Sequence, residues 1–198
     1  MPAFLSPPCL PADCGAALRP LRAADAAAWS AYLSLPGVIE HTSWGDVRQE
    51  AIAGLIAQYG GPEGPWRWAI VDGDDRLMGT VGFNEVVPAH GRAELAYDLD
   101  PACRGRGLAT QAAAALITWA WKEAGLTRVQ ATVLDSNLPS IAVLQRLAMR
   151  REGLLRAYRK VRGQPRGLLA LRNPALNRPP AGGCLKPGCQ NFTLALRL

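Results

Sequence analysis

Hydrophobic positions along the chain change their spacing several times, and each change marks a different predicted element. Alternation of apolar and polar residues predicts strands, whereas apolar residues three or four positions apart predict helices. On this basis the chain should run as one strand, two helices, three strands, and then helix, strand, helix and strand. In chain order, the predicted elements cover residues 16–21, 25–35, 46–59, 66–71, 76–83, 92–99, 109–123, 128–133, 139–147 and 153–161.

Turn-forming residues indicate how the middle strands connect. Asp72-Gly73-Asp74-Asp75 separates strands 66–71 and 76–83 and is typical of a hairpin, and residues 88–91 mark the next turn. Three antiparallel strands followed by alternating helices and strands predict the α+β class. We therefore expect a single domain with a mixed, mostly antiparallel central sheet flanked by helices.

The two ends of the chain have a different character from its middle. Residues 1–14 are rich in proline and cysteine and predict a flexible N-terminal leader, so the folded domain is expected over 15–163. Residues 164–190 carry Gly, Pro and Asn without clear periodicity and predict an irregular loop or tail. Residues 191–198 alternate again and could form a final strand of the sheet.

Length and composition agree with one globular domain. The chain has 198 residues, of which 49% are hydrophobic and 19% are charged, as in ordinary globular enzymes. No apolar run reaches the roughly 20 residues of a membrane-spanning helix. The first residues lack a positive n-region and are broken by prolines, which argues against a secretory signal. We therefore expect a cytoplasmic protein with no membrane partner.

The net charge of +6 favours anionic ligands or partners, although an arginine-rich coding bias explains the composition equally well. Acidic residues gather before position 100, whereas arginines crowd residues 146–172. A nucleic-acid-binding protein could use that basic stretch. It lacks the interleaved aromatic residues of a single-strand platform, so we rank nucleic acid below the other partners.

Cysteine spacing raises the question of a metal site. Four of the five cysteines form two pairs with the same spacing, one near each end of the chain: Cys9, Cys14, Cys184 and Cys189. Four thiolates could bind zinc, but zinc knuckles favour tighter spacing and flanking glycines. His41 and His90 have no metal-ligand spacing. We therefore expect reduced thiols, as is usual in the cytoplasm, and no metal.

A loop rich in glycine and arginine, Arg104-Gly105-Arg106-Gly107-Leu108-Ala109, connects predicted strand 92–99 to predicted helix 109–123. The first turn of a helix has backbone N–H groups without an intrahelical partner, and the helix dipole adds partial positive charge. Glycines let a ligand approach the backbone closely, and the two arginines add further charge. The loop is therefore a predicted pyrophosphate site.

Two other phosphate-binding loops do not fit this segment. A Walker loop needs Lys-Ser or Lys-Thr after its last glycine, where this chain has Leu108-Ala109. A dinucleotide fingerprint needs three spaced glycines in a parallel βαβ unit, whereas the strand before this loop belongs to an antiparallel meander. A connection without a ligand stays the alternative, which the arginines and the position disfavour.

The segment from Glu94 to Ala109 resembles the acetyl-CoA signature of the GNAT superfamily, whose loop has the pattern Gln/Arg-x-x-Gly-x-Gly/Ala. Downstream, the segment from Asp135 to Leu147 resembles the Asn-x-x-Ser region of the subgroup containing ribosomal-protein N-terminal acetyltransferases. The resemblance covers about residues 16–163. It implies the GNAT fold and an N-acetyltransferase domain, with acetyl-CoA as co-substrate, no metal and an amine as acceptor.

The chain departs from that subgroup in two places. Leu147-Ala148-Met149 replaces the usual Leu-Gly-Phe, so a residue other than glycine must end the last predicted helix. The aromatic, acid-bearing strand expected after residues 163–166 is missing. Either residues 191–198 take its place or the sheet is incomplete there.

The resemblance also implies which residues bind the cofactor. The loop and the first helical turn would hold the pyrophosphate, through Arg104, Gly105, Arg106, Gly107, Leu108, Ala109 and Thr110. Backbone groups from Tyr97 to Leu99 would hold the pantetheine arm and stabilise the charge that develops on the thioester carbonyl. Asn137 would bond the same arm or cap the following helix, and the two roles are compatible.

Acetyl transfer to an amine needs a base, because a primary amine is mostly protonated at neutral pH. Glu94 is the predicted base, Glu85 is the second choice, and a solvated, non-catalytic Glu94 is the alternative. Ser140 is a candidate proton donor to the departing thiolate, or else an ordinary helix-start hydroxyl. Three tryptophans could line the acceptor pocket, although buried tryptophans more often belong to the core: Trp44, Trp66 and Trp68.

The favoured function is N-acetyl transfer from acetyl-CoA to a primary amine, directly within a ternary complex. The acceptor is a protein N-terminus or a small amine. A non-catalytic acyl-CoA-binding module, which keeps the loop but does not use Glu94, is the first alternative. A basic nucleic-acid-binding protein ranks below it. The oligomeric state stays open, with a homodimer as one option.

Overall fold

The computed structural model describes residues 6–59 and 65–173. The strands are β1 (Ala17–Pro20), β2 (Arg67–Val71), β3 (Leu77–Val87), β4 (Arg92–Leu99), β5 (Arg128–Leu134), β6 (Arg150–Val161) and β7 (Gln164–Arg172). The helices are α1 (Asp25–Leu33), α2 (Gln49–Gln58), α3 (Leu108–Lys122) and α4 (Leu138–Arg146). The short 3-10 turns are η1 (Ala12–Cys14), η2 (Pro88–His90) and η3 (Pro101–Cys103). The predicted order of elements is confirmed, with one additional strand, β7.

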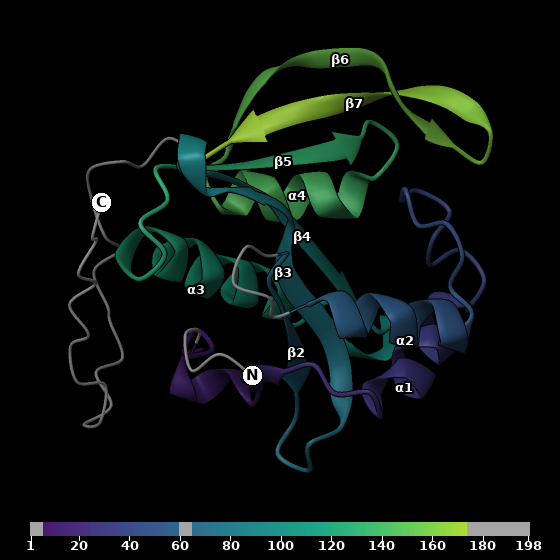
Figure 1. Cartoon of the computed structure of the whole chain (residues 1–198), viewed down its shortest axis with the longest axis vertical. Coiled ribbons are helices and arrows are strands. Elements are labelled where there is room, and N and C mark those ends of the chain that lie inside the picture. Colours follow the sequence, from purple (N-terminus) through teal and green to yellow (C-terminus); the bar gives the residue numbers. More distant parts are fainter. Residues whose placement is uncertain (1–5, 60–64, 174–198) are drawn as a thin grey trace.

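The strands form one sheet in the order β1-β2-β3-β4-β5-β7-β6 (Figure 1). Neighbouring strands are antiparallel except for β4 and β5, which are parallel. α3 and α4 pack on one face of the sheet, and α1 and α2 pack on the other. The structure thus confirms a single α+β domain with a mixed, mostly antiparallel sheet flanked by helices.

β7 corrects the prediction that residues 164–190 form an irregular tail. Arg162 and Gly163 both have positive φ, 49° and 78°, and make the tight turn that reverses the chain from β6 into β7. Residues 168–172 of β7 pair with β5, so β7 lies inside the sheet and β6 forms its edge. The weak alternation of this strand concealed it. The predicted final strand, 191–198, lies outside the described residues.

The amino-terminal segment is more firmly attached than predicted. Leu10 falls in the expected flexible leader, yet it is buried in the same core cluster as Leu18 of β1. The 3-10 turn η1 then leads into β1. The domain therefore begins before the predicted boundary at residue 15, because the apolar side chain of Leu10 is buried in the core.

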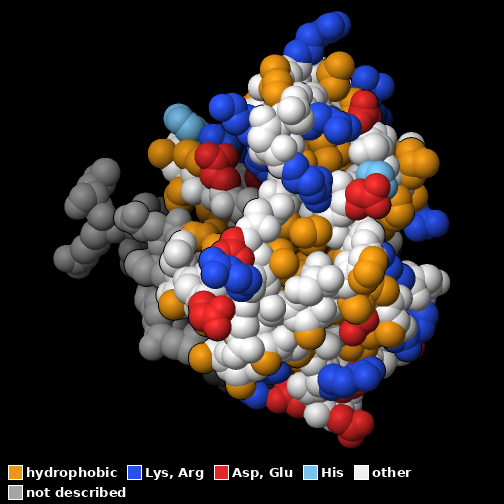
Figure 2. Space-filling model, turned by 90° about the vertical axis from the view of Figure 1, so that its right-hand side faces the viewer, with side chains coloured by type: hydrophobic (Ala, Val, Ile, Leu, Met, Phe, Trp, Pro, Cys, Tyr) orange, Lys and Arg blue, Asp and Glu red, His pale blue; other side chains and the backbone are white. Residues whose placement is uncertain are grey.

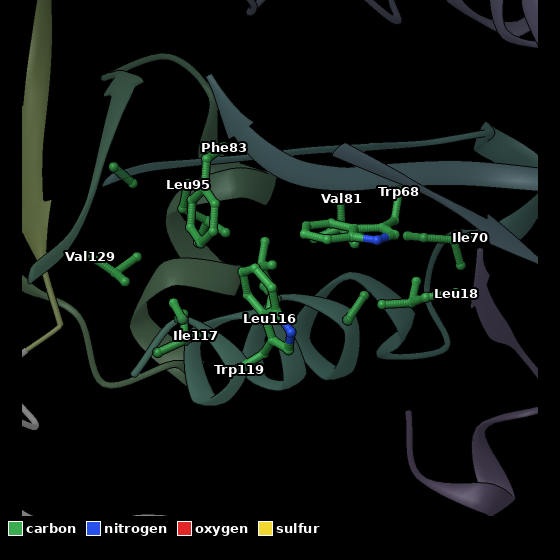
Figure 3. Packing of buried hydrophobic residues seen from close by; sticks show 14 of the residues in the cluster. Leu18, Trp68, Ile70, Val81, Phe83, Leu95, Leu116, Ile117, Trp119 and Val129 are labelled. Carbon is green, nitrogen blue, oxygen red and sulfur yellow. The ribbon is translucent and has the colours of Figure 1, made fainter. Parts of the chain in front are cut away.

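The larger core lies between the sheet and α3 (Figure 3). Leu116 of α3 is fully buried there. Trp66 and Trp68 contact Trp119 edge to face, with ring centroids 5.6 Å and 5.1 Å apart. These two tryptophans therefore belong to the core, and of the three candidates for the acceptor pocket only Trp44 lines the cavity described below.

β4 and β5 separate after a short paired stretch. Residues 92–94 of β4 pair with residues 128–130 of β5. Beyond that point β4 continues beside β3 and β5 continues beside β7, their other neighbours in the sheet. The two strand edges that face each other there have no strand partner among the described residues, so their backbone groups need other partners. We call this opening the wedge.

A buried ion pair joins α1 to three strands. The Asp98 carboxylate of β4 accepts hydrogen bonds from one group on β2, one on β3 and two on α1: Arg67 Nη2 at 2.7 Å, Thr80 Oγ1 at 2.9 Å, Trp29 Nε1 at 3.1 Å and the Tyr32 hydroxyl. The Arg67 side chain is only 4% exposed. A charge this deeply buried is tolerated because it is paired and hydrogen-bonded.

Replacing Asp98 tests how much of the fold this ion pair supports. Asp98→Ala should lower the free energy of unfolding by about 3–5 kcal/mol, the usual cost of leaving one charge of a buried pair without its partner. Urea unfolding measures the change. Asp46→Ala is the control, because Asp46 pairs with Arg48 at the surface and its midpoint should stay close to wild type. Equal midpoints for the two variants would contradict this role of Asp98.

Candidate active site

One cavity of about 1210 Å³ extends from the wedge toward α1 and α2. Its wedge half is formed by the separated parts of β4 and β5, the glycine loop, the N-terminus of α3, and α4. Its helix half is formed by the α1–α2 loop, α2 and side chains from β2, β3 and β6. An elongated ligand in the wedge half could therefore meet a second molecule in the helix half.

The N-terminus of α3 lines the wedge half. Gly107 is the N-cap residue, with φ of 76°, and no side chain caps the first turn. The first N–H groups of α3 therefore have no intrahelical partner and carry the positive end of the helix dipole. Gly105 also has a positive φ, 81°, which glycine adopts without strain. The glycine loop thus lies where the sequence predicts it, at a helix N-terminus.

Thr110, in the first turn of α3, has a buried hydroxyl at the wall of the wedge half. This hydroxyl has no hydrogen-bond partner within the part of the chain that the structure describes. A buried polar group without a partner costs about 1–3 kcal/mol. An oxygen of a bound ligand would supply the missing partner. The residues of this turn therefore fit an anionic or polar ligand at the helix N-terminus.

The open edge of β4 presents backbone groups to the wedge. The Asp100 N–H donates to a carbonyl of β3, and the alternation of an antiparallel strand then directs the backbone groups of Tyr97 and Leu99 to the opposite edge. Arg104 lines the cavity and donates to the Leu99 carbonyl at 3.3 Å. Arg106 is exposed and does not line the cavity.

α4 bounds the wedge half on the side opposite α3. Asn137 caps α4: its side chain accepts a hydrogen bond from the Ser140 N–H at 3.2 Å and donates to the His41 carbonyl at 3.0 Å. The Tyr97 hydroxyl donates to the Ser140 carbonyl at 3.2 Å. Burial raises the pKa of Tyr97 to about 12, so this hydroxyl stays neutral at physiological pH. Asn137 and Ser140 both line the cavity.

Glu94, the predicted base, is buried beside the cavity and does not line it. Its carboxylate accepts a hydrogen bond from Thr132 Oγ1 at 2.8 Å, and Arg159 Nη2 lies 3.6 Å away. Thr132 and Arg159 line the cavity, so Glu94 lies one side chain behind its wall. Glu94 is 5% exposed and is not the solvated residue of the alternative. Glu85 is exposed, pairs with Arg92 at 2.6 Å and does not line the cavity.

The helix half contains a polar cluster that sequence reasoning missed. Arg67 and Asp98 line it together with Asn84, whose side-chain oxygen accepts a hydrogen bond from Arg67 Nη1 at 3.3 Å. The Arg67 guanidinium lies 5.9 Å from the ring centroids of both Trp44 and Tyr59. The available signal was an arginine at the start of the apolar strand β2 and an aspartate near the end of β4, because charged residues are buried only when they are paired.

A contact between the α1–α2 loop and the β6–β7 hairpin covers the helix half. Arg159 of β6 donates to Ser43 Oγ at 2.9 Å. Arg162, in the hairpin turn, donates to the carbonyl of Glu40 at 2.9 Å and to that of Ile39. The tip of the hairpin therefore lies against the loop, as the right-hand side of Figure 1 shows.

Metal-binding and membrane-spanning features are considered for residues 6–59 and 65–173, the part of the chain that the structure describes. Within these ranges no group of three or more His, Cys, Asp or Glu side chains could hold a metal ion. Two of the paired cysteines, Cys184 and Cys189, lie outside them. Within the same ranges, no helix combines the length and the apolar character that crossing a bilayer requires.

The chain is similar to known proteins over a range that includes most of the cavity-lining residues. Residues 16–150 match the family model described as an acetyltransferase (GNAT) domain. The uncharacterized N-acetyltransferase p20 of Bacillus licheniformis is 41% identical over 95 residues, which cover 48% of this chain and 53% of p20. The structure of Mycobacterium smegmatis RimJ in complex with CoA-disulfide is 30% identical with a TM-score of 0.67, covering 84% of this chain and 85% of RimJ.

A more distant structure shows the same fold. The ribosomal-protein-S5-alanine acetyltransferase from Vibrio fischeri is 19% identical, with a TM-score of 0.69, and the match covers 83% of this chain and 96% of that protein. Among curated proteins, the chain spans 53% to 58% of the length of the first three relatives it matches.

Proposed function

Because the chain belongs to the GNAT acetyltransferase family, we propose that it transfers the acetyl group of acetyl-CoA directly to a primary amine while both are bound. The observation that carries this proposal is the buried, unpartnered hydroxyl of Thr110. It lies in the first turn of α3, beside backbone N–H groups without an intrahelical partner, and lines the same cavity as the separated edges of β4 and β5.

The wedge half of the cavity is the proposed cofactor site. Acetyl-CoA, when bound, supplies an acetyl group activated as a thioester. Backbone N–H groups and one hydroxyl of the α3 N-terminus would hold its pyrophosphate, from Gly105, Gly107, Leu108, Ala109 and Thr110. Arg104 adds positive charge at the cavity wall and Arg106 adds it from the exposed side of the loop. Open-edge backbone groups of Tyr97 and Leu99 and the Asn137 side chain would hold the pantetheine arm.

Proton transfer is assigned to two residues at the junction of the two halves. Glu94 would accept a proton from the acceptor ammonium, so that the neutral nitrogen can attack the thioester carbon. Since Thr132 and Arg159 lie between Glu94 and the cavity, we assign this transfer to a bridging water. As the C–N bond forms and the C–S bond breaks, Ser140, which lines the cavity, is the proposed donor of the proton that the departing sulfur takes up, and the proton that the attacking nitrogen loses replaces it.

The helix half is the proposed acceptor site. A protein N-terminus is the favoured acceptor, because the segment around Asn137 and Ser140 resembles that of ribosomal-protein N-terminal acetyltransferases and RimJ is 30% identical over most of the chain. A small amine is the second possibility. The α1–α2 loop and the tip of the β6–β7 hairpin would hold either acceptor over the wedge.

Gly107→Val should weaken coenzyme A binding by about 10-fold or more, because a branched side chain would stand where the pyrophosphate meets the N–H groups of α3. Gly125→Val is the matched control. Gly125 also has a positive φ, 63°, and lies just past the other end of α3, so it suffers the same backbone strain without touching the proposed site. Calorimetric titration measures both affinities, and equal affinities would place the pyrophosphate elsewhere.

Thr110→Val should change stability and affinity in opposite directions. Valine has the shape of threonine but no hydroxyl, so the protein without ligand should be more stable by about 1 kcal/mol, because the unpaired buried group is gone. Coenzyme A should bind about 5-fold more weakly, because that group no longer meets the ligand. Thermal unfolding and calorimetry measure the two effects.

Thr118→Val is the control for the Thr110 variant. Thr118 lies on the same helix, and its hydroxyl is satisfied by the Ala114 carbonyl at 2.9 Å. Its replacement should leave coenzyme A affinity unchanged. If Thr110→Val also leaves the affinity unchanged, the Thr110 hydroxyl does not contact the ligand.

Glu94→Gln should lower the rate at neutral pH by about 10²-fold or more, because the amide cannot accept the amine's proton. Coenzyme A affinity should stay near wild type. Raising the pH should restore part of the rate, since more of the acceptor amine is then already neutral. A pH–rate profile of coenzyme A release measures this, with Glu85→Gln as the control that keeps the wild-type profile.

Two results would contradict the assignment of Glu94. Equal pH–rate profiles for wild type and Glu94→Gln would show that another group, or no group, takes the proton. Tight coenzyme A binding without turnover of any amine by the wild type would instead favour a non-catalytic acyl-CoA-binding module.

A further inference from the structure

The positive charge of the chain is concentrated in the β6–β7 hairpin. Residues 150–172 contain eight of the 22 Lys and Arg residues but only one of the 16 Asp and Glu residues. The net charge of this hairpin, +7, therefore exceeds the +6 of the whole chain. Figure 2 shows blue Lys and Arg side chains gathered toward the upper end of the molecule, where Figure 1 places the hairpin.

The only acidic residue of the hairpin lies near the start of β6. This residue, Glu152, pairs with Arg128 and with Arg172. Toward the turn, Arg156, Lys160 and Arg166 are exposed and form no ion pair with any residue that the structure describes. Arg150 and Arg151, at the other end of the hairpin, are also exposed and without a described ion pair, but only the turn end contacts the α1–α2 loop.

Strand register places one of these cations beside the acceptor site. Arg159 and Arg166 are directly opposite each other in the antiparallel pair β6–β7, so their side chains leave the sheet on the same face. That face is the cavity face, because Arg159 lies 3.6 Å from Glu94 and lines the cavity. Like charges directly opposite each other are destabilising. A bound anion between the two arginines would remove this repulsion.

The carboxylate in the cavity wall and the one directly behind it are already engaged. Asp98 is the only acidic residue among the described cavity-lining residues, and it accepts hydrogen bonds from Arg67 and three other groups. Glu94 is held by Thr132 and Arg159. An acceptor with several positive charges would find no free carboxylate on this wall, whereas an acceptor with negative charge would find Arg166, which is opposite Arg159 and forms no ion pair with any described residue.

We propose that the acceptor is a polypeptide N-terminus with Asp or Glu at the second or third residue, whose carboxylate binds between Arg159 and Arg166. The inference rests on the proposed acetyl transfer. An extended chain spans about 3.3 Å per residue. A carboxylate one or two residues beyond the residue that carries the amine can therefore reach Arg166 while the amine lies near Glu94.

The test is coenzyme A release with peptides that differ only at residues two and three, which are Asp-Asp, Asn-Asn or Lys-Lys. The kcat/KM should be about 10-fold higher for Asp-Asp than for Asn-Asn, and lowest for Lys-Lys, as for one partly desolvated ion pair. Spermidine should be a poor acceptor. The advantage of Asp-Asp should shrink as salt is raised to about 0.5 M, because the arginines are near the surface.

Arg166→Glu should abolish or reverse the order of the peptides while coenzyme A affinity stays at the wild-type value. Arg150→Glu is the matched control, because Arg150 is exposed on the same strand and lies nine residues from Arg159, roughly 30 Å along an extended strand. It makes the same change in net charge and should keep the order of the wild type.

The outcomes separate this inference from the function on which it rests. Equal rates for the three peptides, faster turnover of spermidine, or loss of the Asp-Asp preference in Arg150→Glu as well as Arg166→Glu would overturn the acidic acceptor and leave acetyl transfer intact. Absence of coenzyme A release with every acceptor would overturn the proposed function itself.

Discussion

The separation of β4 from β5 is the constraint on which the rest of the structure depends. Backbone groups left without a strand partner are tolerated inside a protein only where water or a ligand can reach them. The strands therefore part along a cavity, and each stays fixed by its other neighbour, β3 or β7. β7 matters here because without it β5 would lose its remaining sheet partner along residues 131–134 and could not hold the wedge open.

The two faces of the sheet contribute differently to the site. On the face of α3, apolar packing holds the helix rigidly and fixes its N-terminus at the wedge. On the face of α1 and α2, the buried hydrogen bonds of Asp98 also hold the elements in place, since they join α1 to β2, β3 and β4 by directional bonds. Directional bonds fix positions more narrowly than apolar contact does. The proposed acceptor site is thus built on the polar face and the proposed cofactor site beside the apolar one.

Sequence reasoning succeeded where a feature is local and failed where it depends on distant partners. Strand β4 has the predicted bounds, 92–99, and the glycine loop lies at the predicted helix N-terminus, because alternation and glycine content are written in consecutive residues. The sequence also predicts that a residue other than glycine ends the last helix, and Ala148, with φ of 55°, lies just past the end of α4. β7 was missed because its formation depends on pairing with β5, and the role of Asp98 was missed because its hydrogen-bond partners come from three other elements, α1, β2 and β3. The position of Glu94 behind Arg159 depends on β6, 65 residues away in the chain.

The geometry of β6 also determines how copies of this protein can meet. β6 is an edge strand of the sheet, and such strands invite pairing with another chain. Between Leu155 and Arg159 it carries two more residues than β7 does opposite them, and Ala157 there has φ of 49°. The resulting bulge interrupts the row of free backbone groups, and the arginines around it repel an identical edge. At the other edge, β1 is only four residues long and ends in Pro20, which has no N–H to donate. Strand addition is therefore disfavoured at both described edges of the sheet.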